Sequence, residues 1–178
     1  MAATTVAHTA QLDSATLESA WLLVRDAFQP GGFVEQDWEH ALGGMHALVH
    51  DGGELVAHGA VVQRRMLVGG RAWRVGYVEA VAVAGAARRH GHGSAVMEAL
   101  EGVIRAAYDF GALSATDDGA QLYRARGWQL WQGPAAVLSP DGVVRTPDED
   151  GAVYVLPTGE PLELTGQLTC DWRDGDLW

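Results

Sequence analysis

Residues 79–100 read EAVAVAGAARRHGHGSAVMEAL, and the order of patterns in this stretch identifies the fold. The part through Ala84 is a run of small and β-branched apolar residues, which is typical of a strand. The last part repeats apolar residues at helical spacing, so a helix is expected to begin near Gly93. Between them lies the pattern R-x-x-G-x-G, starting at Arg88. A strand, a glycine-rich loop and a helix in this order predict an anion site at the start of the helix.

The loop has the chemistry that a pyrophosphate requires. Gly91 and Gly93 remove side chains that would keep an anion from the backbone, and Arg88 and Arg89 add charge-assisted contacts. Two other nucleotide signatures are absent, because the chain has no lysine for a Walker loop and its glycines lack the dinucleotide-binding spacing. Taken alone, a glycine-rich loop before a helix can also be a simple turn.

Periodicity predicts the elements around this stretch. Apolar residues recur at helical spacing in the first half and after the loop, and Gly-Gly turns at 52–53 and 69–70 separate three strand-like segments into an antiparallel meander. Helices are expected at 14–28, capped by Asp13 or Ser14, at 34–42, at 94–110 with Gly111 as the stop, and at 119–126. Strands are expected at 6–12, 45–51, 54–68, 71–84, 112–116, 128–133 and 152–157. This order predicts an α/β (α+β) fold, a mixed sheet with helices on its faces, in one domain spanning 1–178.

Composition and charge exclude several classes of function. The 178 residues are 48% hydrophobic and 20% charged, as expected of a soluble globular protein. Twelve basic residues, all arginine, oppose 23 acidic ones, and the net charge of -11 argues against nucleic acid or an anionic membrane as a partner. Nine carboxylates lie in residues 141–178. They form either a solubilising surface or a field that attracts a polycation.

The sequence favours the cytoplasm. No apolar run approaches the roughly 18 residues of a membrane span, and the first residues lack the features of a signal peptide. The lone Cys170 cannot form an internal disulfide, which suits a reducing compartment. With no motif around it, a packed thiol is favoured over a nucleophile.

A third segment completes a known arrangement. Residues 122–128 read LYRARGW, about thirty residues after the glycine-rich loop. The strand, the loop and this segment together resemble the GNAT superfamily of acetyltransferases. The resemblance implies that strand backbone runs beside the pantetheine of acetyl-CoA, that the loop holds the pyrophosphate, and that the third segment lies beside the sulfur.

Further blocks narrow the resemblance over nearly the whole chain. Together they resemble the aminoglycoside 2'-N-acetyltransferases, a family that implies the GNAT fold, a mixed and mostly antiparallel sheet with helices on both faces. It also implies acetyl-CoA as cosubstrate, no metal, a cationic aminoglycoside as acceptor, antibiotic resistance and a homodimer. The blocks are DWEHALGGMHAL at 37–48, GYVEAVAV at 76–83, GALS at 111–114, the LYRARGW segment, RTP at 145–147 and CDWRDGDLW at 170–178.

The resemblance assigns the reaction to two side chains. Glu79 would be the general base that takes the amine proton through a water, and Tyr123 the general acid that protonates the departing thiolate. The backbone at Ala80 and Val81 would polarise the acetyl carbonyl. Taken from the residues alone, Glu79 could instead be a surface carboxylate on an edge strand, and Tyr123 a core aromatic. The implied cosubstrate set is Val81, Val83, Arg88, Arg89, His90, Gly91, His92, Gly93 and Ser94.

The resemblance also implies an acidic acceptor cleft, formed by Asp37, Glu79, Ser114, Glu149, Asp176 and the carboxylate of Trp178. Asp37 could instead be a helix cap and Asp176 a solvated tail residue. Glu149 departs from the family pattern, which has Asp at this position, so the geometry at the acceptor is expected to differ.

The histidines do not suggest a metal site. Those at 46, 50 and 58 lie on expected strands without any partner motif, while His90 and His92 are expected to face phosphate or solvent.

Three functions remain open at this point. The first is transfer of acetyl from acetyl-CoA to the 2'-amine of an aminoglycoside, directly within a ternary complex. The second is acetylation of another cationic amine, such as a kasugamycin-like aminoglycoside, a polyamine or a protein N-terminus. The third is a non-catalytic protein that sequesters a cationic drug.

Overall fold

The computed structural model describes residues 2–178, except for the side chains of residues 117 and 118. The chain divides into two compact units. Unit 1 consists of Met1–Val62 and Val78–Val103, and unit 2 consists of Gln63–Tyr77 and Ile104–Trp178.

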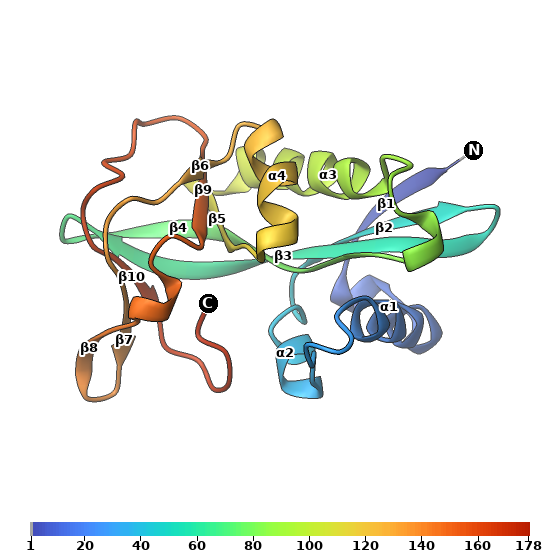
Figure 1. Ribbon diagram of the computed structural model, residues 1–178, viewed down its shortest axis with the longest axis horizontal. Helices are drawn as coiled ribbons and strands as arrows, with labels where there is room; N and C mark the ends of the chain where they lie inside the picture. The colour runs from blue at the N-terminus through green and yellow to red at the C-terminus, as the bar shows by residue number, and fades with distance from the viewer. Residues whose placement is uncertain (1) are drawn as a thin grey trace. The chain divides into compact units, whose positions relative to one another are not determined.

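Four α-helices and ten strands make up the described part of the chain (Figure 1). The helices are α1 Ser14–Ala27, α2 Glu35–Glu39, α3 His92–Ala107 and α4 Asp117–Ala125. The strands are β1 Ala3–His8, β2 Met45–Asp51, β3 Glu54–Val68, β4 Arg71–Val83, β5 Phe110–Ser114, β6 Gln129–Leu130, β7 Ala135–Ser139, β8 Gly142–Arg145, β9 Val153–Pro157 and β10 Leu168–Asp171. Single turns of 3-10 helix lie at Thr9–Gln11, Gly85–Ala87 and Pro147–Glu149.

The predicted meander corresponds to β2, β3 and β4, which are neighbours in this order in the sheet. β2 and β3 are antiparallel, and Gly52 and Gly53 in the turn between them have positive φ. β1 adds to the free side of β2 as a further antiparallel strand. The helices α1 and α2 lie on one face of these strands and α3 on the other (Figure 1). On the α3 face, a Cβ on Gly59 would lie 2.6 Å from Cγ1 of Val96, so only glycine permits this helix–strand contact.

Unit 2 mixes parallel and antiparallel pairs. β5 runs parallel to the first part of β4, through Val75–Tyr77, and antiparallel to β9. β10 lies between β3, to which it is antiparallel, and β7, to which it is parallel. β7 and β8 form a hairpin at the end of this strand order.

The predicted fold class is confirmed, since a mixed and mostly antiparallel sheet is combined with four α-helices. The strands predicted at 45–51 and 54–68 have the observed bounds, and Asp13 caps α1 through a bond from the amide of Thr16. Among the described residues, no helix has the length and apolar character needed to span a membrane.

Some predicted elements are wrong. The helix expected to reach residue 110 ends at Ala107. The side chain of Asp109 accepts the amide of Arg74, and the amide of Asp109 donates to the carbonyl of Arg74, so the chain turns into β5. Gly111 is therefore a strand residue, where a Cβ would meet Ile104 and Trp128 at 3.1 Å. The strand expected at 128–133 is limited to β6, the helix at 34–42 is limited to α2, and β7, β8 and β10 were not predicted.

Candidate active site

The second half of β4 carries Glu79 and a distorted backbone. β4 pairs with β5 only through Val75–Tyr77, so Glu79 lies beyond the end of that pairing. Ala80 has φ of 52°, a left-handed conformation that costs a non-glycine residue about 1–3 kcal/mol. Glu79 is half-buried beside it. The distortion changes the direction of the backbone groups between Glu79 and Val81, where the thioester was expected.

The loop after β4 has the geometry of an anion site. Arg89 and Gly91 have φ of 67° and 85°, and the amide of Ala95 bonds to the carbonyl of Gly91 as the first turn of α3. The amides of residues 92–94 therefore lie at the helix start, where no intrahelical acceptor is available. Arg88, Arg89 and His90 are exposed around this helix end.

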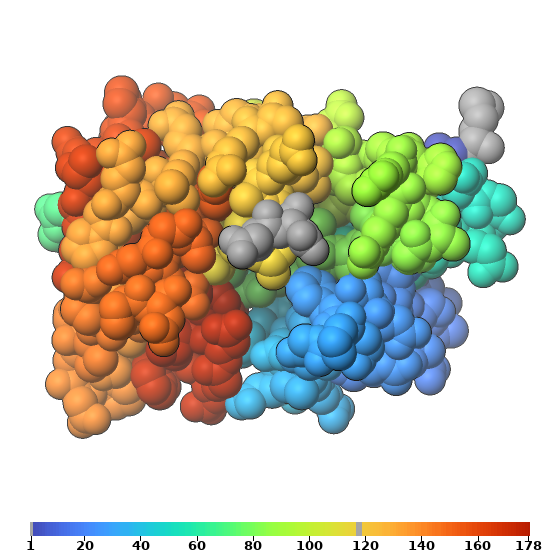
Figure 2. Space-filling model, in the orientation of Figure 1, coloured from blue at the N-terminus to red at the C-terminus, as the bar shows by residue number. Residues whose placement is uncertain are grey.

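The loop lies beside α1 on the surface of unit 1. A guanidinium nitrogen of Arg88 is 3.4 Å from the carbonyl of Ala27, and Figure 2 shows the green loop next to the blue α1. The two histidines of the loop differ in exposure. His90 is exposed, whereas His92 begins α3 and is 7% exposed, so of the two surroundings expected for it, solvent is excluded. The two rings lie 6.2 Å apart.

Two buried histidines lie against Ala80 on the face of the sheet that α2 covers. Nδ1 of His58 is 2.9 Å from the carbonyl oxygen of Ala80, and Nε2 of His58 is 2.9 Å from Nδ1 of His46. Both imidazoles are 0% exposed and Trp38 packs against both rings. Burial lowers the pKa of His58 to about 3 and that of His46 to about 4. Both rings are therefore neutral at physiological pH.

Tyr123 occupies an apolar site in unit 2. It lies on α4, is 8% exposed and contacts the rings of Trp128 and Tyr154. Burial raises its pKa to about 12, so the hydroxyl keeps its proton at neutral pH. A protonated hydroxyl can donate to a thiolate, as a general acid must. The burial of the ring also agrees with the alternative from the sequence, in which Tyr123 is a core aromatic.

An acidic cluster forms where β5 and the turn before β9 meet in unit 2. The hydroxyl of Ser114 donates to Oε2 of Glu149 at 2.7 Å. Burial raises the pKa of Glu149, and the charges of Asp176 and Asp148 raise it further, while the bond from Ser114 lowers it. Two predicted acceptor residues that are far apart in sequence, Ser114 and Glu149, are therefore in contact, and the charge of a third, Asp176, acts on Glu149.

The C-terminal residues are held in place beside this cluster. Trp178 is 5% exposed, its indole donates to the hydroxyl of Thr146 at 3.0 Å, and its amide donates to Oδ1 of Asp176. The buried Arg64 donates to the carbonyl of Leu177 and to both the side chain and carbonyl of Asp171. The indole of Trp178 is thus a structural anchor.

Asp37 has the structural role that its position allowed. Its Oδ2 accepts the amide of Val34 at 2.9 Å and caps the start of α2. Asp37 belongs to unit 1.

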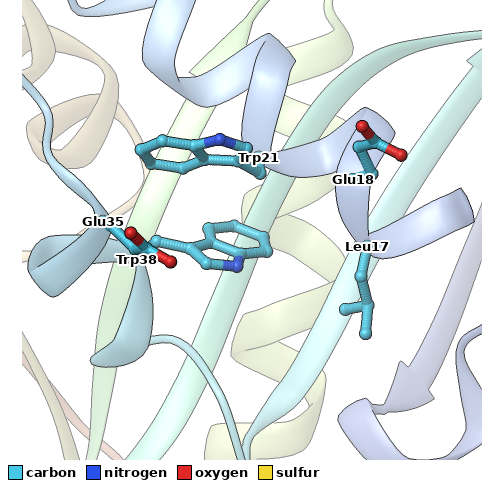
Figure 3. Close-up of a pocket in the computed structure, with 5 residues that line it drawn as sticks. All are labelled: Leu17, Glu18, Trp21, Glu35 and Trp38. Carbon is cyan, nitrogen blue, oxygen red and sulfur yellow. The ribbon is translucent and has the colours of Figure 1, made fainter. Parts of the chain in front are cut away.

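A shallow pocket of about 200 Å³ lies between α1 and α2 in unit 1 (Figure 3). Its lining combines two indoles with two carboxylates, a set that suits an alkylammonium group. The indole centroids are 6.2 Å apart, and that of Trp38 is 5.3 Å from the ring of His58. None of the residues predicted from the sequence is among those lining it, which are Leu17, Glu18, Trp21, Glu35 and Trp38.

Cys170 is a packed thiol, as the sequence favoured. It is 1% exposed, its sulfur is 3.6 Å from the carbonyl of Leu177, and burial raises its pKa to about 11. Among the described residues, no group of three histidine, cysteine or acidic side chains could hold a metal ion.

Sequence reasoning missed the histidine pair, Arg64 and Thr146. The two histidines and Arg64 occupy inward-facing strand positions, where the neighbouring inward positions are apolar. A polar residue in an apolar pattern was the only signal for them. Thr146, by contrast, lies in a turn and offered no signal beyond the RTP block.

Comparison with known proteins agrees with this geometry. The acetyltransferase (GNAT) domain family matches residues 10–131. A curated aminoglycoside 2'-N-acetyltransferase from Mycolicibacterium fortuitum is 54% identical over 175 residues, which cover 96% of this chain and 89% of that protein.

Solved structures share the fold at low identity. A GNAT family acetyltransferase from Brucella melitensis, in complex with acetyl-CoA, has a TM-score of 0.61 and 15% identity over 93% of this chain and 94% of that one. Eis1 from Mycobacterium abscessus has a TM-score of 0.60 and 22% identity over 75% of this chain, which spans 33% of Eis1. Taken with the sequence matches, the kinked strand and the helix that follows it, these comparisons show that the chain belongs to the aminoglycoside 2'-N-acetyltransferases of the GNAT superfamily.

Proposed function

We propose that residues 1–178 act as a single GNAT domain that transfers acetyl from acetyl-CoA to the 2'-amine of an aminoglycoside. One observation carries the proposal: a kinked strand leads through a glycine-rich loop into the start of α3 in a chain 54% identical to an aminoglycoside 2'-N-acetyltransferase. Acetylation removes a positive charge from the drug and weakens its hold on RNA, so expression of the protein is expected to confer resistance.

Acetyl-CoA would bind along β4 and at the start of α3. The amides of Gly93 and Ser94 and the guanidinium groups of Arg88 and Arg89 would hold the pyrophosphate. The missing side chain of Gly91 and the imidazoles of His90 and His92 would help. The backbone of Val81 and Val83 would pair with pantetheine amides. What supports this assignment is the left-handed backbone at Arg89 and Gly91, which turns the loop around the helix end.

The chemical step would use Glu79 and Tyr123. The amine nitrogen attacks the thioester carbonyl and the C–S bond breaks, while the amine proton passes through a water to Glu79 and the thiolate takes the proton of Tyr123. The backbone at Ala80 and Val81 would stabilise the developing oxyanion. Direct transfer is favoured because Cys170 is buried and its thiol has a raised pKa.

The acceptor would bind among carboxylates. A polycation gains from several acidic groups that bind its ammonium groups while Glu79 deprotonates the reacting amine. The cluster of Ser114 and Glu149, with Asp176 near it, supports this role. The proposed acceptor groups are Asp37, Glu79, Ser114, Glu149, Asp176 and the carboxylate of Trp178.

The proposal extends to assembly and location. We propose a homodimer, since the β7–β8 hairpin, which ends the strand order, exposes the apolar residues Leu138, Val143 and Val144. Analytical ultracentrifugation tests it, and a Val143→Lys/Val144→Lys variant should shift a dimer toward monomer if this hairpin forms the interface. We also propose a cytoplasmic location, in keeping with the single reduced Cys170.

Initial rates of thiol release with a panel of aminoglycosides, kasugamycin, polyamines and peptides test the reaction, and NMR of the product identifies the acetylated nitrogen. Activity confined to a non-aminoglycoside amine would indicate a different acceptor, and a drug that binds without gaining acetyl mass would indicate sequestration.

Glu79→Gln and Tyr123→Phe should each lower kcat by about 100-fold at neutral pH with little change in folding. Unchanged kcat in either variant would contradict the role given to that residue.

A further inference from the structure

The buried histidine pair forms a hydrogen-bonded ladder that ends on the distorted residue of β4. The ladder runs from Thr9, whose hydroxyl lies 2.7 Å from Nε2 of His46, through the contact between the rings, to the carbonyl of Ala80. In the register of β2 and β3, His46 pairs with Ala60 and His58 pairs with Leu48. The two rings are thus diagonal neighbours on one face of the sheet.

Only one arrangement of protons satisfies the ladder when both rings are neutral. The carbonyl of Ala80 can only accept, so His58 carries its proton on Nδ1. Its Nε2 is then an acceptor, and His46 must also be protonated on Nδ1. The remaining lone pair on Nε2 of His46 accepts from the hydroxyl of Thr9.

The outer end of the ladder is anchored to backbone. The hydroxyl oxygen of Thr9 accepts the amide of Gly43 at 2.9 Å. The carbonyl of Gly44 is a second acceptor for the hydroxyl proton, but at 3.3 Å it is farther than His46. Every polar atom of the two rings therefore has a partner, and the chain of bonds has one direction, from Thr9 toward Ala80.

The location of the ladder gives it a use. Two imidazoles buried at 0% exposure are costly to place in a core that apolar side chains could fill, and such polar networks fix one conformation where a core would allow several. Here the fixed group is the carbonyl of a residue with φ of 52°. That residue lies between Glu79, the general base of the proposed function, and Val81, whose backbone would help to stabilise the oxyanion.

We propose that His58 and His46 are positioning residues, which act with Thr9 to hold the carbonyl of Ala80 and so to direct the Glu79–Val81 backbone at the acetyl thioester. This inference rests on the proposed function. The ladder touches neither the acceptor nor the acetyl group in this role. Its loss should therefore lower kcat and leave the KM values for acetyl-CoA and the acceptor nearly unchanged.

Matched variants at His58 test the inner end. Asn can place an amide N–H where Nδ1 of His58 lies, and Leu cannot. His58→Leu should lower kcat by about 10- to 100-fold, since small displacements of reacting groups have effects of this size, and His58→Asn should recover most of that loss. Circular dichroism and thermal unfolding measure the folded fraction of each variant, and each kcat is expressed per folded molecule.

Matched variants at Thr9 test the ladder as a unit, three hydrogen bonds from Ala80. Thr9→Val removes the hydroxyl at nearly constant shape and should lower kcat roughly two- to tenfold, whereas Thr9→Ser keeps the hydroxyl and should retain kcat. An equal kcat per folded molecule in the Val and Ser variants, with a loss confined to thermal stability, would show a structural role only and overturn the inference.

Imidazole NMR on the wild-type protein gives a readout that does not depend on activity. Long-range 1H–15N spectra should show His46 and His58 both neutral and both protonated on Nδ1, and Thr9→Val should shift the Nε2 resonance of His46. Protonation of either ring on Nε2 would refute the ladder even if the enzyme is active. A wild type that transfers no acetyl would remove the proposed function and this role together, whereas an active wild type with unaffected variants removes only the inference.

Discussion

At Glu149, stability and the proposed binding of the acceptor make opposite demands. The carboxylate is half-buried, and burial together with Asp176 and Asp148 raises its pKa. An ionised group held in such surroundings opposes folding, because its charge is better solvated in the unfolded chain. The same surroundings make it a strong partner for an ammonium group. The bond from Ser114 compensates part of the cost, which is what a preformed binding site requires.

Replacement of Glu149 by Gln should therefore stabilise the protein while it weakens binding. We expect Tm to rise by about 2 °C and the KM for a cationic aminoglycoside to rise by about tenfold. Thermal unfolding and initial-rate kinetics measure the two effects. Asp148→Asn removes the same charge from an exposed neighbour and should change both quantities much less. A fall in Tm with an unchanged KM would contradict this account of Glu149.

The histidine pair should give unfolding a distinct pH dependence. The folded pKa values, about 4 for His46 and about 3 for His58, lie below the ordinary value of 6.5. Below pH 6.5 the unfolded chain therefore binds protons that the folded chain does not, and the free energy of unfolding falls as the pH falls. The slope should approach about 1.4 kcal/mol per pH unit for each histidine.

Chemical denaturation between pH 7 and 5 measures this slope above the range in which most carboxylates titrate. His8 is the other titratable group that acts on His46, and it makes protonation of that ring still less favourable. Glu149 acts in the opposite sense, because its raised pKa favours the folded state as the pH falls. A free energy of unfolding that stays constant over this interval would mean that the rings accept protons without cost in the folded state.

Among the elements, the sequence predicted those whose ends are marked by residues nearby in the chain. Glycine pairs with positive φ bound β3 on both sides, so its limits could be read from the chain. β10 could not be predicted, because this four-residue strand depends on partners far away in sequence, β3 and β7. The end of α3 depends in the same way on the distant Arg74.

The same distinction between local and distant contacts applies to the candidate site. The loop before α3 is one continuous motif and was predicted from spacing. The contact of Ser114 with Glu149 joins residues 35 apart, and only a family resemblance placed them in one site. The histidine ladder joins three segments by side-chain bonds, and no periodicity encodes such bonds.

The C-terminal segment depends on one buried side chain. Arg64, on β3, makes three hydrogen bonds to Asp171 and Leu177. Lys keeps the charge but cannot make the forked contacts, so Arg64→Lys should lower the free energy of unfolding by about 2 kcal/mol. It should also raise the KM for the acceptor, since Asp176 and Trp178 lose their support. Denaturant unfolding and kinetics measure both effects.

The adjacent Arg65 provides the control. Its side chain is exposed and its amide bonds to Oδ2 of Asp171, a contact that Arg65→Lys retains. This variant should stay within about 0.5 kcal/mol of the wild type. A loss in Arg64→Lys no larger than that in Arg65→Lys would show that the forked contacts of Arg64 do not hold the segment.

Over the whole molecule, charge favours a cationic acceptor. The excess of 23 acidic over 12 basic residues gives a net charge of -11. Such a field attracts a polycation and repels the anionic acetyl-CoA, so the cosubstrate depends on local groups. In the proposed function, the exposed Arg88 and Arg89, at the positive end of α3, provide that local attraction.

The two substrates should therefore respond to salt in opposite ways. Long-range attraction is screened beyond a Debye length, about 8 Å at physiological ionic strength. Raising NaCl from about 20 to 200 mM should lower kcat/KM for a tetracationic aminoglycoside by about tenfold, with little change in kcat, because salt weakens encounter and not chemistry. The kcat/KM for acetyl-CoA should fall much less or rise, since salt also screens its repulsion. If both values fell together by the same factor, salt would be acting on the folded enzyme itself, and the acidic surface would serve solubility alone.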